Sequence, residues 1–421
     1  TQFYPGTVLG IITDLARAIE RNELEKMKEL LAQLGKTPFF KKTKPTPYDE
    51  AVSLIWYLEN VFYHAVTHIF DYIQNNIFEG EPLENQVINL GFWPGGDRDG
   101  NPFVTTEITL KVAERLRQTI LRNYHKDLRK LRRRITFKGA EELVLDLENK
   151  VSEHINLPQE KGTLTSEEIL ESLTAIKDVL EAQHQGLFVD RVVDLMNKVK
   201  LFGLYFATLD IRQDSRVHTH VMNSIAEDHP KLFGKEYESL EDSEKIKLLS
   251  SITGKISPDS LQLEMAQKTI ASIYAMQDIQ KYNGEQGCNR YIISNNGSVV
   301  NVLEAFAMIR LTGWKNPTVD VVPLFETVDD LEVANQVMET LYTNKEYAAH
   351  LKRRGNKQSI MLGFSDGTKD GGYLMANWGI FTAKERLTEV SRKYGITVIF
   401  FDGRGGPPAR GGGKTHQFYA S

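Results

Sequence analysis

Apolar residues recur at helical spacing through the first 200 residues of the chain. Positions 8, 11, 12, 15 and 19 are Val, Ile or Leu, and a second apolar series runs from Leu54 to Val66. The proline-containing segment 44–47 interrupts this pattern, and Asp49 then lies near a helix start, where its charge suits the helix dipole. A further helix is expected from about Thr106 to Leu131. The pattern predicts a mainly helical region over residues 1–200.

The pattern changes at about residue 200, where short apolar runs begin to alternate with helical stretches. Continuous apolar runs of four to eight residues between helices are typical of parallel strands buried on both faces. The runs cover 204–211, 290–294, 319–325, 360–364 and 397–401, and the helical stretches include 258–280, 328–342 and 373–392. They predict an α/β fold with predominant helix, in which residues 201–421 form part of a (β/α) barrel. An open doubly wound sheet also fits, and periodicity alone does not choose between the two.

Composition narrows the class of protein. The chain has 421 residues, of which 41% are hydrophobic and 25% charged, enough to bury a large core in two or more domains. Its net charge of −5 gives no electrostatic argument for a nucleic-acid partner, and no apolar run approaches the roughly 18 residues that a membrane helix needs. The single cysteine, Cys288, excludes intrachain disulfides and fits a cytoplasmic location. Because the chain starts at Thr1 without a methionine and stops just after a glycine-rich loop, we expect it to be an internal fragment.

One basic run needs a separate explanation. Residues 129–134 read Arg-Lys-Leu-Arg-Arg-Arg, but no aromatic side chains interleave them, as they do in many nucleic-acid surfaces. We interpret the run as a solvated helix end or an internal anion site.

The segment 91–102, Gly-Phe-Trp-Pro-Gly-Gly-Asp-Arg-Asp-Gly-Asn-Pro, cannot be the interior of a helix or strand. Its four glycines allow backbone angles closed to other residues and let another segment approach the main chain closely. Asp97, Arg98 and Asp99 add charges that would be costly to bury unpaired. We interpret the segment as a charged functional loop, although a short Gly/Asp loop taken alone is more often a surface turn.

Two carboxylates follow predicted strands and are each followed by a polar turn. Glu326 comes after the run 319–325, and Asp366 comes after the run 360–364. Parallel strands carry their chemistry at their carboxyl ends, so the two side chains should meet at one mouth. Two hard oxygen ligands with room for water and substrate suit Mg²⁺ or Mn²⁺. A lone carboxylate in such a position more often caps the next helix.

Basic residues lie at or just after the same predicted strand ends: Arg212, Lys369, Arg404 and Arg410. Arginine forms paired hydrogen bonds to phosphate or carboxylate, so the set predicts a small polyanionic substrate, although any one arginine is more often a surface ion pair. Residues 403–413 contain six glycines and two arginines, which is typical of a lid that closes over anions. We expect this lid to be mobile without ligand.

Five segments together resemble one enzyme family. The loop 91–102 is similar to a motif of phosphoenolpyruvate carboxylase, and four further segments of that family follow in the same order. These segments are Leu209-Asp-Ile-Arg-Gln-Asp-Ser215, Pro323-Leu-Phe-Glu-Thr327, Phe364-Ser-Asp-Gly-Thr-Lys-Asp370 and the glycine-rich run 403–413. The resemblance covers nearly the whole chain.

The resemblance implies metal-dependent carboxylation of phosphoenolpyruvate with bicarbonate, giving oxaloacetate and phosphate in an anaplerotic role. It implies a (β/α)8 barrel, Mg²⁺ or Mn²⁺ on Glu326 and Asp366, a cytoplasmic homotetramer and regulation by small molecules. Arg212, Lys369, Arg404 and Arg410 would be catalytic, and the three arginines would also bind substrate. Trp93 would help to form the bicarbonate pocket. The family would also place a catalytic histidine just before Thr1 and further cationic residues after Ser421, so the fragment alone should be inactive.

One position departs from the family pattern, because Asp402 stands where many members have histidine. Two alternatives remain. The chain could belong to another phosphoenolpyruvate- or pyruvate-handling barrel enzyme, such as a lyase or dikinase, which would not share the loop 91–102. It could instead be a noncatalytic fragment that binds anions or supports assembly.

Overall fold

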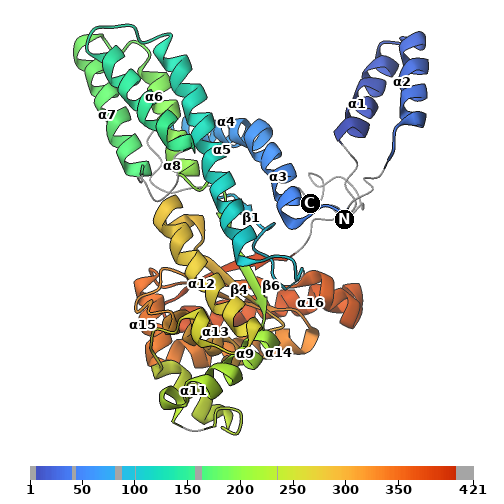
Figure 1. The fold of residues 1–421 in the computed structure, drawn as a ribbon, viewed down its shortest axis with the longest axis vertical. Helices are drawn as coiled ribbons and strands as arrows, with labels where there is room; N and C mark the ends of the chain where they lie inside the picture. The colour runs from blue at the N-terminus through green and yellow to red at the C-terminus, as the bar shows by residue number, and fades with distance from the viewer. Residues whose placement is uncertain are drawn as a thin grey trace.

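The first eight helices of the chain form an extended helical part (Figure 1). The computed structural model describes residues 6–39, 44–80, 88–99, 101–156, 164–234 and 236–403. The helices before the main sheet are α1 (Gly6–Glu20), α2 (Leu24–Lys36), α3 (Pro47–Tyr57), α4 (Tyr63–Asn76), α5 (Thr106–Arg132), α6 (Ala140–Asn156), α7 (Ser166–Gln183) and α8 (Val189–Phe202), with a π-helical turn at Leu58–Phe62. Helices α5 to α8 form an arm, and the α1–α2 hairpin lies apart from it.

Local signals explain where these helices begin. Thr46 and Asp49 form a reciprocal capping box at the start of α3, with Pro47 in the first turn. The side chain of Thr105 accepts a hydrogen bond from the Ile108 amide at the start of α5. The base of α5 is held on a later helix, since Asn283 donates to the carbonyl of Ala113. The long helix predicted over residues 106–131 is therefore confirmed.

The strands lie after residue 200, apart from a short β1 (Gly91–Phe92). The five-stranded sheet has the order β3-β4-β5-β6-β7, and every neighbouring pair is parallel. Its strands are β3 (Ile211–Asp214), β4 (Arg290–Ser294), β5 (Asp320–Phe325), β6 (Lys357–Leu362) and β7 (Thr397–Asp402); β1 pairs separately with β2 (Thr208–Leu209). The order follows the sequence without the reversal of a doubly wound sheet. Among the described strands β3 and β7 remain at the two ends of the sheet, so a closed barrel is not confirmed.

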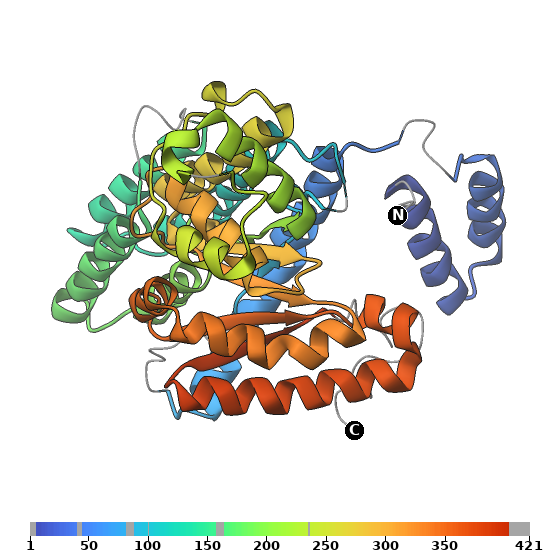
Figure 2. The same ribbon diagram turned by 90° about the horizontal axis from the view of Figure 1, so that it is seen from below.

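Helices pack against one face of this sheet and against each other, as Figure 2 shows for the long α16 beside β7. They are α9 (Ser215–Asp228), α10 (Pro230–Phe233), α11 (Asp242–Ser251), α12 (Glu264–Asn283), α13 (Val299–Leu311), α14 (Val328–Thr343), α15 (Lys345–Arg353) and α16 (Phe364–Lys393). Short 3₁₀ turns lie at Pro258–Ser260 and Glu285–Gly287. Helix α16 contains a kink at Gly372, whose φ of 77° is non-helical.

Alternate strand residues face two different apolar clusters. Tyr291, Ile293 and Phe325 belong to the main core under the helices. On the other face, Ile292, Val322, Leu324 and Met361 form a small separate cluster, with Trp93 packed against it. The loop that begins at β1 therefore covers the face of the sheet that the helices leave open.

One sequence expectation, the strand over 204–211, needs correction, and another, the domain boundary at residue 200, remains a prediction. The strand predicted over 204–211 begins only at Thr208, because residues 203–206 form turns in which Phe206 has a φ of 63°. The change from helices to alternating strands and helices does follow α8, but the division into domains at residue 200 stays a prediction. None of the helices in the described part of the chain combines the length and apolar content that a membrane crossing requires.

Candidate active site

The loop after β1 runs as an extra strand segment along β3. Asp97 forms a parallel bridge with Arg212, supported by a hydrogen bond from the Arg98 amide to the Arg212 carbonyl (3.0 Å) and one from the Arg212 amide to the Gly96 carbonyl (3.0 Å). The two backbones touch at Gly96, where an added Cβ would lie 2.9 Å from the carbonyl carbon of Asp210. The expectation that the glycines permit a close backbone approach is confirmed.

Arg212 is the electrostatic centre of the site. Its Nη2 lies 2.7 Å from an oxygen of Asp99 and 3.6 Å from Oε1 of Glu326, and its Nε lies 3.8 Å from Oδ1 of Asp97. The guanidinium group also lies over the ring of Trp93, 5.6 Å from the ring centroid. Arg212 therefore joins the loop to the end of β5 in a largely buried position.

Trp93 is fixed on two sides. Its Nε1 donates to Oδ2 of Asp97 at 2.7 Å, and its ring meets that of Phe401 on β7 edge to face, with the centroids 6.4 Å apart. The side chain thus spans from the loop to the last described strand.

Glu326 follows β5 directly, as predicted. Its Oε2 accepts a hydrogen bond of 2.7 Å from the backbone amide of Asn295, which directly follows β4 and has a left-handed φ of 52°. Burial raises the pKa of Glu326, and the nearby charges of Asp366 and Asp99 raise it further, whereas the Asn295 hydrogen bond and the charge of Arg212 oppose the rise. The carboxylate therefore lies in a partly desolvated environment with charges of both signs around it.

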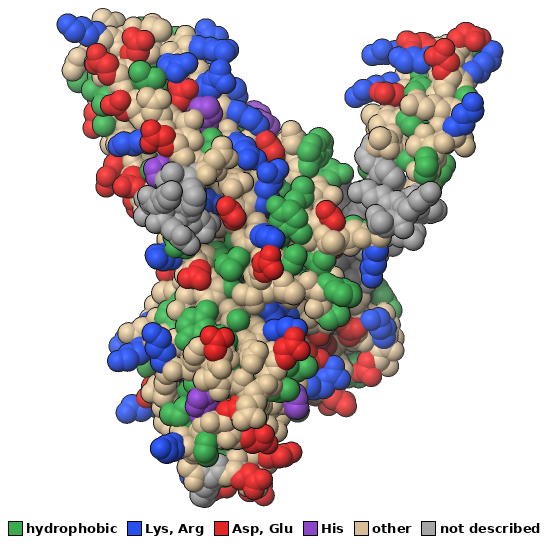
Figure 3. Space-filling model, viewed as in Figure 1, with side chains coloured by type: hydrophobic (Ala, Val, Ile, Leu, Met, Phe, Trp, Pro, Cys, Tyr) green, Lys and Arg blue, Asp and Glu red, His purple; other side chains and the backbone are tan. Residues whose placement is uncertain are grey.

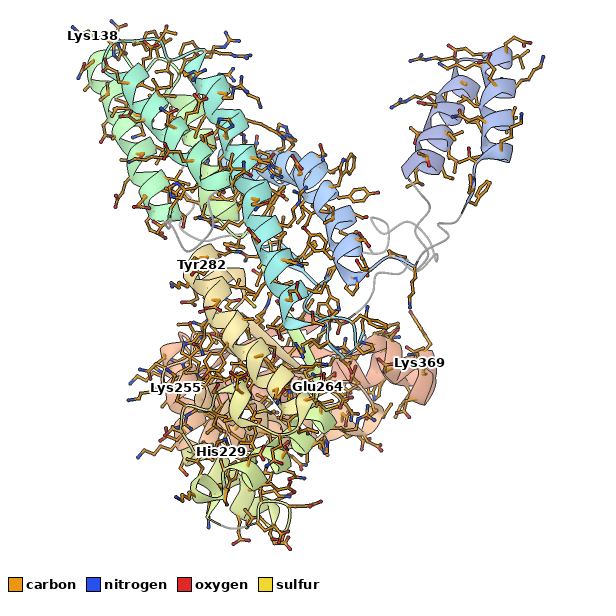
Figure 4. The ribbon with its side chains drawn as sticks, in the orientation of Figure 1. Lys138, His229, Lys255, Glu264, Tyr282 and Lys369 are labelled. Atoms are coloured by element: carbon orange, nitrogen blue, oxygen red, sulfur yellow. The ribbon has the colours of Figure 1, made fainter. Side chains whose placement is uncertain are left out.

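Asp366 lies on a helix, whereas Glu326 directly follows a strand. Strand β6 ends at Leu362, and Asp366 lies in the first turn of α16 rather than at the strand end. The start of α16 passes close to Glu326, since a Cβ on Gly363 would lie 3.1 Å from the Glu326 Cα. Asp366 is coupled electrostatically to Glu326 and pairs with Lys369 at 2.7 Å. Lys369 is largely exposed on α16, at the rim of the site (Figure 4).

Comparison with known proteins identifies the family of the chain. The model of the phosphoenolpyruvate carboxylase family matches residues 12–161 and 140–420. The chain belongs to the phosphoenolpyruvate carboxylase family. Curated relatives named phosphoenolpyruvate carboxylase include those of Nitrosomonas eutropha (28% identical, 94% of this chain and 48% of the relative), Shewanella halifaxensis (29%, 96% and 49%) and Gloeobacter violaceus (27%, 97% and 51%). The chain spans about half the length of these relatives.

Membership of the phosphoenolpyruvate carboxylase family rules out the predicted alternative of a separate lyase or dikinase family. It does not exclude a noncatalytic role for this part of the chain. Of the predicted site residues, the structure brings Trp93, Arg212 and Glu326 together. Asp366 lies near enough for its charge to raise the pKa of Glu326, and its carboxylate pairs with Lys369 at the rim. Arg404, Arg410 and all but the first residue of the predicted lid 403–413 lie outside the described residues. Asp402, at the end of β7, pairs with Lys384 on α16 at 2.8 Å.

Arg98 is the residue that the sequence analysis underrated. Its Nε and Nη1 are buried and have no hydrogen-bond partner within the described residues. Burial lowers the pKa of its guanidinium group, whose charge also acts on the buried hydroxyl of Tyr291 on β4. The two flanking aspartates do not neutralise it, because Asp97 bonds to Trp93 and Asp99 to Arg212. Buried, unpaired guanidinium nitrogens are costly, so an anion is expected beside them.

The donor set can accommodate the divalent cation expected of a phosphoenolpyruvate carboxylase. Among the described residues, no group of three or more His, Cys, Asp or Glu side chains could hold a metal. Glu326 and Asp366 nevertheless offer hard oxygens, and burial, together with the charges of Asp366 and Asp99, raises the pKa of Glu326. Mg²⁺ is commonly held by one or two carboxylates, with water and substrate filling its remaining positions. The two carboxylates therefore fit the cation without a third protein ligand.

Proposed function

We propose that this chain supplies the anion- and metal-binding part of a site that carboxylates phosphoenolpyruvate with bicarbonate, giving oxaloacetate and phosphate. One observation carries the proposal. Arg98, Arg212, Glu326 and Asp366 come from four separate segments near one end of a parallel sheet, and Nε and Nη1 of Arg98 have no hydrogen-bond partner among the described residues. Family membership supports the same reaction.

In this reaction an oxygen of bicarbonate attacks the phosphorus of phosphoenolpyruvate and the bond from phosphorus to the enol oxygen breaks. The products of this step are carboxyphosphate and the enolate of pyruvate. Carboxyphosphate releases carbon dioxide and phosphate, and the enolate carbon then forms a bond to the carbon dioxide. Negative charge therefore develops on phosphoryl oxygens first and on the enolate oxygen afterwards.

Each described residue has a defined role in this scheme. Arg98 and Arg212 bind the phosphoryl oxygens, where preorganised donors in a water-poor site stabilise developing charge. Asp99 and Asp97 hold the Arg212 side chain in place from one side, and Trp93 lines the bicarbonate pocket. Lys369 lies at the rim of the site, where its ammonium group can leave its ion pair with Asp366 and bind an entering anion.

Glu326 and Asp366 hold Mg²⁺ or Mn²⁺, which when bound supplies positive charge to the enolate oxygen. Arg404 and Arg410 belong to a glycine-rich lid that closes over the bound anions. The sequential order of the five parallel strands supports their assignment to a (β/α)8 barrel. We also infer, from the family alone, an anaplerotic role, regulation by small molecules and a homotetrameric full-length protein; the single cysteine supports a cytoplasmic location.

The decisive experiment measures oxaloacetate formation by coupled reduction in the full-length protein that contains this chain. Arg212→Gln should lower kcat/KM by about 10²- to 10³-fold, because it removes a preorganised donor. Arg392→Gln, which changes an exposed arginine in the last turn of α16, is the matched control and should stay within about twofold of wild type.

Glu326→Gln should raise the Mg²⁺ concentration needed for half-maximal rate, whereas Glu332→Gln on the exposed side of α14 should not. Wild-type kcat/KM in Arg212→Gln would rule out the assigned role. If the wild-type full-length protein forms no oxaloacetate, the noncatalytic alternative is favoured instead.

A further inference from the structure

A basic cavity lies on the arm, where the end of α5 meets the beginning of α8. It has a volume of about 390 Å³, within the range of small-molecule sites. Five basic and two acidic side chains line it, in a chain whose net charge is −5. Basic side chains also gather along this arm in Figure 3. The cavity therefore has the opposite charge balance to the chain as a whole.

The floor of the cavity is an internally neutral cluster. Lys198 is buried and lies 3.0 Å from Asp127 and 2.8 Å from Asp194, and Lys130 lies 2.8 Å from the other oxygen of Asp127. Asp127 also accepts a hydrogen bond from the hydroxyl of Tyr63. The two acids are thus occupied by the two lysines, and they leave the remaining basic side chains of the cavity unneutralised.

Those remaining side chains are Arg133, Arg134 and Arg191. All three side chains are exposed, and within the described residues none of their guanidinium groups forms an ion pair or a side-chain hydrogen bond. The neighbouring Arg132 shows that carboxylates are within reach on this arm, because it pairs with Glu148 at 2.8 Å. Three unpaired guanidinium groups around one cavity make a geometry suited to phosphate oxygens.

Helix electrostatics explain two of these arginines but not the third. Arg133 and Arg134 directly follow the last turn of α5, where basic residues are favourable. Arg191 lies in the first turn of α8 beside Asp190; the dipole there favours the aspartate and disfavours the arginine, and the N-cap residue Phe188 offers no side-chain cap. An anion between the two helix ends would stabilise Arg191, whose side chain has no ion-pair partner among the described residues.

We propose that this cavity binds a small phosphate-bearing anion, at a site separate from the candidate active site. Helix α5 has 27 residues, which at 1.5 Å per residue is about 40 Å, and the two sites lie at its opposite ends. Figure 4 shows the same separation: Lys138, just beyond α5, is at the tip of the arm, and Lys369 is beside the sheet.

Isothermal titration calorimetry with inorganic pyrophosphate, in a chelator and at constant ionic strength, tests the proposal. The titrated protein is the full-length protein carrying Arg212→Gln, which weakens the candidate active site. We expect saturable binding of one pyrophosphate per chain. In this background Arg191→Gln should weaken binding about tenfold, as the loss of a charge-assisted hydrogen bond predicts.

Arg129→Gln is the matched control, because Arg129 is an exposed arginine in the last turn of α5, beside the cavity, but does not line it. It should change the affinity less than twofold. Arg134→Gln gives an independent second variant, and thermal unfolding verifies that each variant is folded. Parallel titrations with inorganic phosphate and sulfate determine whether a single anionic group is enough.

Equal weakening by Arg129→Gln and Arg191→Gln would mean diffuse electrostatic attraction and would overturn the proposal. So would the absence of saturable pyrophosphate binding in the Arg212→Gln background. Because this readout does not depend on oxaloacetate formation, it stands or falls independently of the proposed reaction.

Discussion

Gly96→Ala should separate the loop after β1 from β3. A Cβ at this position would lie 2.9 Å from the carbonyl carbon of Asp210 and closer still to its oxygen, and both are main-chain atoms that cannot rotate away. The loop must therefore shift as a unit. Asp210 is itself held, because its carboxylate pairs with Arg290 at 2.6 Å and its amide donates to the Phe92 carbonyl.

The expected cost follows from the contacts that the shift would break. The two backbone hydrogen bonds that join Gly96 and Arg98 to Arg212 are worth about 1 kcal/mol each. Loss of the buried contact between Arg212 and Asp99, a charge-assisted pair, adds about 1.5 to 3 kcal/mol. We therefore expect local destabilisation of about 3.5 to 5 kcal/mol. We also expect lower activity, because Arg98 and Arg212 would both be displaced.

Hydrogen exchange read by mass spectrometry provides the direct assay. Peptides covering residues 91–99 and 208–214 should lose protection in Gly96→Ala, while peptides from α6 and α7 should not. Gly10→Ala is the matched control, since an added Cβ there meets no atom within 4 Å, and alanine favours helix α1 by about 1 kcal/mol. Unchanged protection of 208–214 in a folded Gly96→Ala variant would refute the assigned pairing of loop and strand.

Three further predictions concern buried charges and the extent of the chain. Burial lowers the pKa of His218 and of His350 to about 3, so each is neutral when folded and takes up a proton on unfolding below its ordinary value of 6.5. Each histidine should lower the free energy of unfolding by about 1.4 kcal/mol per pH unit as the pH falls from 6.5 towards 3. Urea unfolding at several pH values should therefore show a smaller pH dependence for His350→Leu than for wild type. An unchanged pH dependence would contradict the reasoning. Burial raises the pKa of Glu304, which accepts hydrogen bonds from Thr219 and Tyr237. Its charged form is therefore penalised as the pH rises, so Glu304→Gln should gain unfolding free energy relative to wild type as the pH rises above the ordinary glutamate value of 4.5. A difference that stays constant with pH would exclude titration of this group. The 421-residue chain alone should form no oxaloacetate from phosphoenolpyruvate in the coupled assay, and full activity would show that the residues described suffice.

Local pattern was enough to predict the position of several elements. The spacing of apolar residues predicted α5, and Asp49 was recognised near the start of α3 because capping depends only on residues three apart. The same logic failed at residues 204–207, since an apolar run shows that a segment is buried but not that it is extended. Phe206 lies there in a left-handed turn inside the core.

The candidate site depended more strongly on the tertiary structure. The sequence alone identified Trp93, Arg212, Glu326 and Asp366 as candidates, through strand-end positions and through motifs shared with a family. It could not determine which charges neutralise which, because pairing depends on distances between segments that lie far apart in the chain. The sequence places Arg98 between two aspartates without assigning partners, and the structure directs Asp97 to Trp93 and Asp99 to Arg212. The same holds on the arm, where only folding brings Arg191 to the basic end of α5. The sequence determines which charged residues are available, and the packing of helices and strands determines which of them pair with one another.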